Sequence, residues 1–368
     1  MSKNQSTGDK TVPIGDIAKL LGGSFGPAFR LLVSRAAMVR QWSMLLREGT
    51  DPIVRLLLEA NNTALINRWL DNGTKVVFVS SYPRSGNTWM RYMLSDVLLQ
   101  MHGVETSTKL PVDPDNLIAL FENDCIVRRL ARCPKWVFEA PMVFVKTHAA
   151  LTRLEQTFSN YGSQSSARPH GAAPYRDCRA LFLYRAPEDA MVSYYHLEAA
   201  YRGKEICGID EFCQRHLGGW VTNITSHLRA ADKGFPVFFV PYDQLLAKPV
   251  IVLTNMLQWL GVEQESRIAQ RAVSNMRFCN LQAMEKKEND TEHPRDENAL
   301  FFRRGQNGSG RQELKESTLR EIQDRTASWI REANERHAQQ SSALTVPAAP
   351  APVKNGEVSE PVISPCPQ

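Results

Sequence analysis

The chain has 368 residues, of which 43% are hydrophobic and 23% charged, so it is long enough for one large or two ordinary folded domains. Its formal net charge of +5 suits an anionic ligand, and the lack of a dense Lys/Arg block argues against nucleic acid as a partner. The seven cysteines are scattered without a CxxC pair, which indicates free thiols in a reducing compartment rather than disulfides or a zinc site. No apolar stretch approaches the roughly 20 residues of a membrane span. Charged residues interrupt the first apolar ones, so we expect a cytoplasmic enzyme without a signal peptide.

Residues 1–70 are predicted to form an N-terminal helical segment. Residues 1–15 are polar, and residues 27–48 combine four arginines with apolar residues in the pattern of a basic amphipathic helix. A helix of this kind either packs on a folded domain or lies on a membrane surface. We expect the first arrangement and keep membrane-surface binding as the alternative.

Four short apolar runs alternate with helical patterns from residue 75 onward. Short β-branched runs of this kind are typical of buried parallel strands. The predicted strands are 75–82, 142–148, 179–185 and 235–242. Helical spacing follows in residues 90–101, 187–201 and 249–260. Strands alternating with helices indicate an α/β fold with a central, mainly parallel sheet flanked by helices.

Two segments lack the pattern of a folded core. Residues 160–178 are rich in Ser, Gly, Ala and Pro and are predicted to form an insertion loop. Residues 338–368 form a Pro/Ala-rich tail that is predicted to be disordered, because it has no periodic apolar face to bury. The main folded domain is therefore assigned to residues 71–335.

The loop after the first predicted strand, within "SSYPRSGNTWMRYM" at 80–93, has the composition of an anion site. A short turn between a buried strand and a helix presents backbone N–H groups, and the helix dipole adds partial positive charge. Gly86 lets the backbone approach a ligand closely. Ser85 and Thr88 offer hydroxyls, and Arg84 offers a planar donor fork that matches phosphate or sulfate.

The loop lies within a predicted three-layer α/β/α fold of the P-loop type, and the first hypothesis for it is the phosphate loop of a nucleoside triphosphatase or kinase. The spacing G-x-x-x-x-G-K-[ST] is absent, however. The third predicted strand ends in Arg185, where such proteins commonly carry a carboxylate for magnesium. These residues predict a nucleotide with two separate anionic ends and no metal.

Four motifs together resemble the sulfotransferases that use 3′-phosphoadenylyl sulfate (PAPS). "YPRSGNTW" (82–89) is similar to the loop that binds the 5′-phosphosulfate, and "FVKTH" (144–148) is similar to the end of the catalytic strand. "LYRAPEDAMVSYYH" (183–196) resembles the 3′-phosphate motif, and "FFRRGQNGSG" (301–310) resembles a late basic loop. The motifs occur in the order of the family, and the resemblance covers residues 74–330.

The resemblance implies three catalytic residues. Arg84 would contact the transferring sulfuryl group, Lys146 would neutralise charge on its oxygens, and His148 would be the general base. A single histidine after a strand is more often structural, so the assignment of His148 depends on the neighbouring Lys146. The chain departs from the family in two places. Arg84 stands where the family usually has Lys, and Ser309–Gly310 stands where the family has Trp.

The resemblance also implies a set of nucleotide-binding residues. Arg185 and Ser193 would bind the 3′-phosphate, a late loop would close over it, and Trp89 and Phe278 would stack on adenine. The alternatives are a solvated loop for the paired arginines and core packing for Phe278. The implied nucleotide ligands are Arg84, Ser85, Gly86, Asn87, Thr88, Trp89, Arg185, Ser193, Tyr242, Phe278, Arg303, Arg304 and Gly305.

The function implied is transfer of a sulfuryl group from PAPS to a hydroxyl or amine, which leaves adenosine 3′,5′-bisphosphate (PAP) and needs no metal. The acceptor would be a small molecule or a glycan, and the sequence identifies neither it nor the oligomeric state. One alternative is a magnesium-dependent P-loop kinase for nucleotides or small molecules. The other is a non-catalytic nucleotide-binding protein.

Overall fold

The computed structural model describes residues 66, 69–70, 73–103, 117–120, 142–151, 178–202, 206–262, 265–292, 302 and 305–344. The chain divides into two compact units, Met1–Leu57 and Leu58–Gln368, and all described residues belong to the second unit. The predicted amphipathic helix at 27–48 therefore lies outside the described residues. So does nearly all of the predicted insertion loop at 160–178.

The described strands form one parallel sheet of five strands in the order β2-β3-β1-β4-β5. The strands are β1 (Lys75–Ser81), β2 (Ala119–Leu120), β3 (Met142–Thr147), β4 (Cys178–Tyr184) and β5 (Val237–Pro241). The predicted α/β fold and four of these strands are confirmed, and β2 was not predicted. With two residues, β2 is too short to leave a recognisable apolar run.

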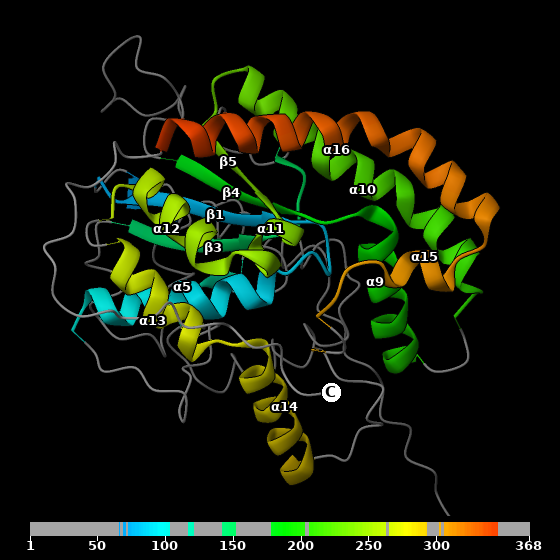
Figure 1. Cartoon of the computed structure of the whole chain (residues 1–368), viewed down its shortest axis with the longest axis horizontal. Coiled ribbons are helices and arrows are strands. Elements are labelled where there is room, and N and C mark those ends of the chain that lie inside the picture. The colour runs from blue at the N-terminus through cyan, green and yellow to red at the C-terminus, as the bar shows by residue number, and fades with distance from the viewer. Residues whose placement is uncertain are drawn as a thin grey trace, which may run out of the picture. The chain divides into compact units, whose positions relative to one another are not determined.

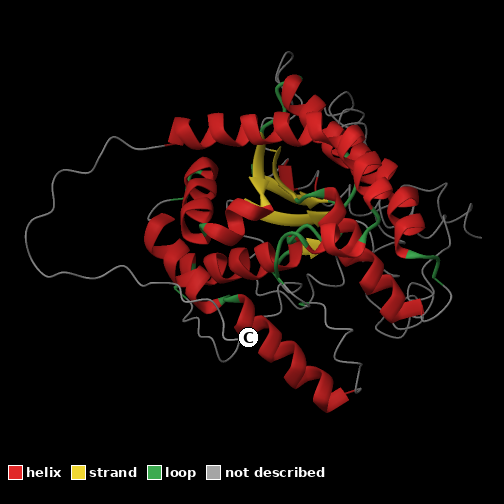
Figure 2. Ribbon diagram, turned by 45° about the vertical axis from the view of Figure 1, so that its right-hand side comes forward, coloured by secondary structure: helices red, strands yellow, loops and turns green. Residues whose placement is uncertain are grey.

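Helices cover both faces of the sheet, which gives three layers (Figures 1 and 2). The helices are α5 (Asn87–Met101), α9 (Pro187–Arg202), α10 (Ile209–Asp232), α11 (Tyr242–Ala247), α12 (Pro249–Leu260), α13 (Glu265–Asn275), α14 (Phe278–Glu292), α15 (Ser309–Glu313) and α16 (Glu316–Leu344). Alternate residues of β1 separate the two cores, because successive side chains of a strand point to opposite faces. Val76 and Phe78 pack with residues of α9, α10 and α16, whereas Val77 and Val79 pack with α5, α12 and α13.

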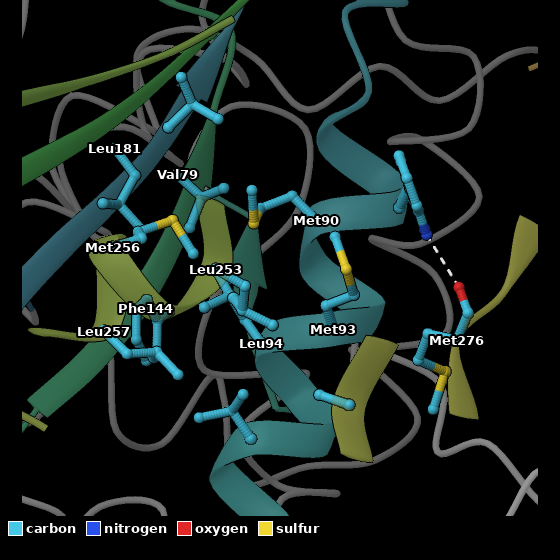
Figure 3. Packing of buried hydrophobic residues seen from close by; sticks show 14 of the residues in the cluster. Val79, Met90, Met93, Leu94, Phe144, Leu181, Leu253, Met256, Leu257 and Met276 are labelled. Atoms are coloured by element: carbon cyan, nitrogen blue, oxygen red, sulfur yellow. Dashed lines mark hydrogen bonds between the residues drawn. The ribbon is translucent and has the colours of Figure 1, made fainter. Parts of the chain in front are cut away.

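The second of these cores is rich in methionine and leucine. Met90, Met93 and Leu94 of α5 pack with Leu253 and Met256 of α12 on the same face of the sheet, as Figure 3 shows. Each of these five side chains is fully buried. Burying a side chain of this size contributes about 1.5–3 kcal/mol relative to leaving it exposed, so the first turns of α5 are held firmly against β1.

The order of the strands predicts where a ligand binds. From the central strand β1 the chain turns to one side to form β2 and β3, and it then crosses to the other side to form β4 and β5. In open α/β sheets, ligands bind beyond the carboxyl ends of the strands where the strand order reverses in this way. The loop after β1 and the residues that follow β3 and β4 lie at this point.

The C-terminal helix α16 extends into the segment that was predicted to be disordered. The prediction of a disordered tail from residue 338 is wrong for residues 338–344, because α16 continues to Leu344. The rest of the predicted tail lies outside the described residues. Gln340 accepts a hydrogen bond from the N–H of Phe239 (3.0 Å) and donates one to the carbonyl of Val237 (2.5 Å). His337 donates from Nδ1 to the carbonyl of Phe239 at 2.8 Å. Polar side chains attach this end of α16 to β5. Because no apolar face marks these residues, the apolar pattern of the sequence does not reveal that the helix continues.

Candidate active site

The loop between β1 and α5 contains two residues with left-handed backbone. Arg84 has φ 65° and Gly86 has φ 96°. For a non-glycine residue this conformation costs about 1–2 kcal/mol, so the surrounding structure must hold Arg84 in place. A Cβ on Gly86 would lie 2.7 Å from the ring of Tyr242, which leaves no room for a side chain. The loop therefore needs glycine at 86 both for its conformation and for its contact with Tyr242.

Ser85 and Asn87 lie on either side of Gly86 and are both buried. The hydroxyl of Ser85 has no hydrogen-bond partner among the described residues, as expected of a group that binds a ligand. The Nδ2 of Asn87 instead donates to the carbonyl of Val79 (3.0 Å) and to Oγ of Ser81 (3.1 Å), so this side chain braces the loop against β1. Thr88 lies half-buried in the first turn of α5.

His148 follows β3 and lies against the end of β1. Its Nδ1 is 2.7 Å from the carbonyl oxygen of Ser81. Because a carbonyl oxygen only accepts, Nδ1 must carry the proton, and Nε2 then carries the lone pair. The backbone carbonyl of His148 accepts a hydrogen bond from Asn223 Nδ2 at 3.2 Å. The contact with Ser81 therefore fixes the tautomer of the imidazole, and the contact from α10 holds the backbone of His148 in place.

Burial and the neighbouring cations keep the ring of His148 neutral. Burial lowers the pKa of His148 to about 3, with Lys146 and Arg91 acting in the same direction and the hydrogen bond to Ser81 opposing them. Lys146 lies two residues earlier, on the same face of β3, and is in register with Val79 of β1. At neutral pH the imidazole can accept a proton at Nε2, and Lys146 supplies positive charge beside it.

Arg185 follows β4 and joins three segments. Its Nη1 donates to the carbonyl of Arg84 at 3.4 Å, and its Nη2 donates to the carbonyl of Gln306 at 2.5 Å. Its Cζ lies 4.6 Å from the ring centroid of Tyr242, in a cation–π contact. The Nε of Arg185 is buried and has no hydrogen-bond partner among the described residues. The predicted 3′-phosphate ligand therefore has a donor that the described part of the protein does not use.

Two further predicted ligands lie beside these residues. Ser193 of α9 accepts a hydrogen bond from Nε of Arg84 at 3.1 Å, which brings it next to the loop after β1. Tyr242 is buried between Gly86 and the guanidinium of Arg185. Burial raises the pKa of Tyr242, and the two neighbouring arginines Arg185 and Arg84 oppose that effect.

The predicted adenine-binding residues include Trp89 and Phe278. The Nε1 of Trp89 donates to the carbonyl of Met276 at 2.8 Å, a bond drawn in Figure 3. Its ring lies edge-on to that of Tyr242, with centroids 6.5 Å apart. Phe278 lies against Gly305, where a Cβ would approach the ring to 2.7 Å. Gly305 has φ 58°, and Arg303 and Arg304 lie outside the described residues.

Several residues near this site were missed by the sequence analysis. Ser81 acts through its backbone carbonyl, and Asn223 comes from a helix more than 70 residues further along the chain. Neither leaves a signal in the local sequence. Arg91 does leave one, because it is a charged residue within the apolar pattern of α5 and is buried.

The described residues offer no sign of two other classes of site. They contain no group of three or more His, Cys, Asp or Glu side chains that could hold a metal ion. No helix in this part of the chain is long and apolar enough to span a bilayer.

Comparison with known proteins identifies the family. The family model for the sulfotransferase domain matches residues 74–334. A flavonol 3-sulfotransferase of Flaveria bidentis is 23% identical over 269 residues, covering 67% of this chain and 78% of that protein. Cytosolic sulfotransferase 7 of Arabidopsis thaliana is 21% identical over 255 residues, covering 65% of this chain and 73% of that protein. The solved structure of mouse sulfotransferase SULT7A1 complexed with PAP is similar, with a TM-score of 0.48 and 18% identity over 76% of this chain and 93% of that one. Because the family model covers more than half of the chain, and the four motifs fall within the match, the chain belongs to the family of PAPS-dependent sulfotransferases.

Proposed function

We propose that the chain transfers the sulfuryl group of PAPS to a hydroxyl or amine of a small-molecule acceptor, with His148 as the general base. The observation that carries the assignment of the base is the 2.7 Å contact between Nδ1 of His148 and the carbonyl of Ser81, which leaves the lone pair on Nε2. A base of this kind must be neutral before the reaction, and the low pKa of His148 meets that condition.

The polar groups at the end of the sheet fit a nucleotide with two anionic ends. Near one end of the site are the buried hydroxyl of Ser85 and the left-handed turn through Gly86. Near the other end are the Nε of Arg185 and the loop at Gly305. Arginine donors and backbone N–H groups are the usual ligands of phosphate and sulfate. We assign the first set to the 5′-phosphosulfate and the second to the 3′-phosphate.

In the proposed reaction Nε2 of His148 takes the proton of the acceptor as its oxygen or nitrogen bonds to sulfur. The bond between sulfur and the bridging phosphate oxygen breaks, and PAP leaves with the electron pair. Lys146 and Arg84 stabilise the negative charge on the sulfuryl and bridging oxygens. An arginine stays protonated in proteins, so Arg84 acts through its charge and not as a proton donor.

The bound nucleotide should also change the basicity of His148. Negative charge near an imidazole raises its pKa, because it favours the protonated form. The value of about 3 applies without nucleotide, where Lys146 and Arg91 repel the imidazolium. We therefore expect the imidazole to become a stronger base when PAPS neutralises these cations, which couples proton abstraction to nucleotide binding.

The names of the relatives support a small-molecule acceptor. One relative is a flavonol 3-sulfotransferase and another is named a cytosolic sulfotransferase, so we also propose a cytoplasmic location for this chain. A glycan acceptor is the alternative. Acceptor pockets in such enzymes are built from loops, and the candidate segments here are 104–140, 149–178 and 200–235. The first two lie largely outside the described residues, so the acceptor has to be found by assay.

A labelled-PAPS assay against phenols, alcohols, amines and sugars tests this proposal. It should be combined with a thermal shift experiment with PAP, with ATP, and with each in EDTA. A ligand that binds only the native state at 100 times its Kd stabilises by about 2.7 kcal/mol, which is readily measured. We expect PAP to stabilise the protein in EDTA. If only ATP with magnesium stabilises the protein, the result would favour the alternative function of a magnesium-dependent kinase. Tight binding of PAP without turnover of any acceptor would favour a non-catalytic nucleotide-binding protein.

A further inference from the structure

Asp189 connects helix α9 to the loop that precedes α15. Its Oδ2 accepts a hydrogen bond from the N–H of Gly308 at 2.8 Å, and its Oδ1 accepts one from the N–H of Gly310 at 2.8 Å. The hydroxyl of Ser309 lies 3.5 Å from Oδ1. Asp189 is only 2% exposed. Hydrogen bonds to a buried carboxylate are among the stronger ones in proteins, so this side chain is a firm anchor for the loop.

The backbone of the loop lies directly on α9 at this point. A Cβ on Gly310 would lie 2.5 Å from the carbonyl carbon of Glu188. Such a distance requires atoms to move, and here the neighbouring atom belongs to the backbone of a helix. In Figure 1, α15 lies beside α9. The glycine and the carboxylate thus specify one position for the loop.

The same loop touches the residues proposed to bind the nucleotide. The carbonyl of Gln306 accepts a hydrogen bond from Nη2 of Arg185, and Gly305 packs on the ring of Phe278. Residues 305–310 are therefore fixed to α9 at one end and contact Arg185 and Phe278 at the other. A change at Asp189 would alter the position of the backbone beside Arg185, although the hydrogen bonds that the described structure gives its carboxylate all go to the loop.

The other polar contacts between α15 and α9 are less suited to this role. Glu188 and Arg311 approach to 3.7 Å, but the side chain of Arg311 is 69% exposed, and exposed ion pairs contribute little. His196 and Glu313 are 2.5 Å apart at the far end of α15, away from Gly305. Among these contacts, only that of Asp189 is fully buried and made to the backbone of the loop.

We infer that Asp189 is a positioning residue that holds residues 305–310 in place over the 3′-phosphate end of the nucleotide site. This inference rests on the proposed function. It assigns to the first turn of α9 a role in selecting nucleotides that carry a 3′-phosphate. Asp189 would act through the loop and Arg185, without contacting the nucleotide.

The test is the substitution Asp189→Asn, with affinities for PAP and for 5′-AMP measured by titration calorimetry. Asn has nearly the same shape, but its NH₂ group would face one of the two backbone N–H donors. We expect the affinity for PAP to fall by at least about tenfold, which corresponds to the loss of one charge-assisted hydrogen bond. The affinity for 5′-AMP should change much less, since it lacks the 3′-phosphate, so the ratio of the two affinities should shrink.

Asp210→Asn is the matched control. Asp210 of α10 also accepts a backbone N–H, that of Lys315 at 3.0 Å, and this contact is made beyond the C-terminal end of α15 rather than to residues 305–310. We expect this variant to keep the wild-type ratio. If the ratio of the affinities for PAP and 5′-AMP fell equally in both variants, the effect would be a general structural one, and the inference would be overturned.

The remaining outcomes separate this inference from the proposed function. If the wild type does not prefer PAP to 5′-AMP, the proposed function fails. If the wild type prefers PAP and Asp189→Asn keeps the full preference, the inference alone is wrong. Should Asp189→Asn not fold, Gly310→Ala perturbs the same contact from the side of the loop. Retention of the full preference in that variant would overturn the inference in the same way.

Discussion

Replacing Arg185 by alanine tests the assignment of the 3′-phosphate site. The guanidinium donates to two carbonyls and lies on the ring of Tyr242, while its Nε has no partner among the described residues. A charge-assisted hydrogen bond to phosphate contributes roughly 1.5–3 kcal/mol. The substitution should therefore weaken binding of PAP by about 10- to 150-fold. Binding of 5′-AMP should change little, because that nucleotide lacks the phosphate in question.

The assay is equilibrium binding of PAP and 5′-AMP to the wild type and the variant. Arg179→Ala is a matched control. The Nη1 of Arg179 donates to the carbonyl of Trp259 at 2.7 Å, and its guanidinium lies 5.3 Å from that ring. It makes the same kinds of contact near the opposite end of β4. We expect Arg179→Ala to lower stability without changing the preference for PAP.

The result that would refute this reasoning is Arg185→Ala with an unchanged preference for PAP over 5′-AMP. The thermal midpoint of each variant should be measured alongside, since loss of the contacts to Arg84 and Gln306 also affects the loop. If the variant bound both nucleotides more weakly by the same factor, Arg185 would support the structure of the site rather than contact the 3′-phosphate.

Three further predictions concern His148, His227 and Gln340. His148→Ala should lower kcat by about 10²- to 10⁴-fold and leave the affinity for PAP nearly unchanged. If the variant keeps the turnover of the wild type in steady-state assays, His148 has a structural role and is not the base. Burial lowers the pKa of His227 to about 4, so between pH 6.5 and 4 the unfolded chain holds a proton that the native protein lacks. Over this pH range His227 should lower the free energy of unfolding, measured with urea, by about 1.4 kcal/mol for each pH unit of acidification. His227→Gln should reduce that slope. Gln340→Ala should lower the free energy of unfolding by about 1–3 kcal/mol, because it leaves two backbone groups of β5 without their partner, whereas the exposed Gln339→Ala should not.

The sheet and its loop could be predicted because their signals are local. Each predicted strand is a short apolar run, and Gly86 and Arg84 lie in the short segment that joins β1 to α5. The switch in strand order after β1 cannot be read from any single segment. The resemblance to the family nevertheless placed Lys146 and Arg185 near the same loop, and the sheet brings the ends of their strands together.

The remaining features depend on contacts between distant segments. Asp189 binds backbone groups about 120 residues away, and Asn223 binds the backbone of His148 from 75 residues away. Backbone acceptors and donors are present at every residue, so the sequence does not single out which of them will be used. Gln340 was missed for a related reason, since its contact with β5 is polar and interrupts no apolar pattern.

The contact between Gln340 and β5 also bears on how copies of this chain behave together. β5 is the last strand of the described sheet and pairs with β4 on one side only. An open strand edge is a template on which another chain can add a strand, and this is a common route to aggregation. The amide of Gln340 and the ring of His337 occupy the N–H of Phe239 and the carbonyls of Val237 and Phe239. The last turns of α16 thus cover the edge of the sheet. A chain shortened before Gln340 would keep its core and the proposed nucleotide site, but it would expose a strand edge that favours self-association.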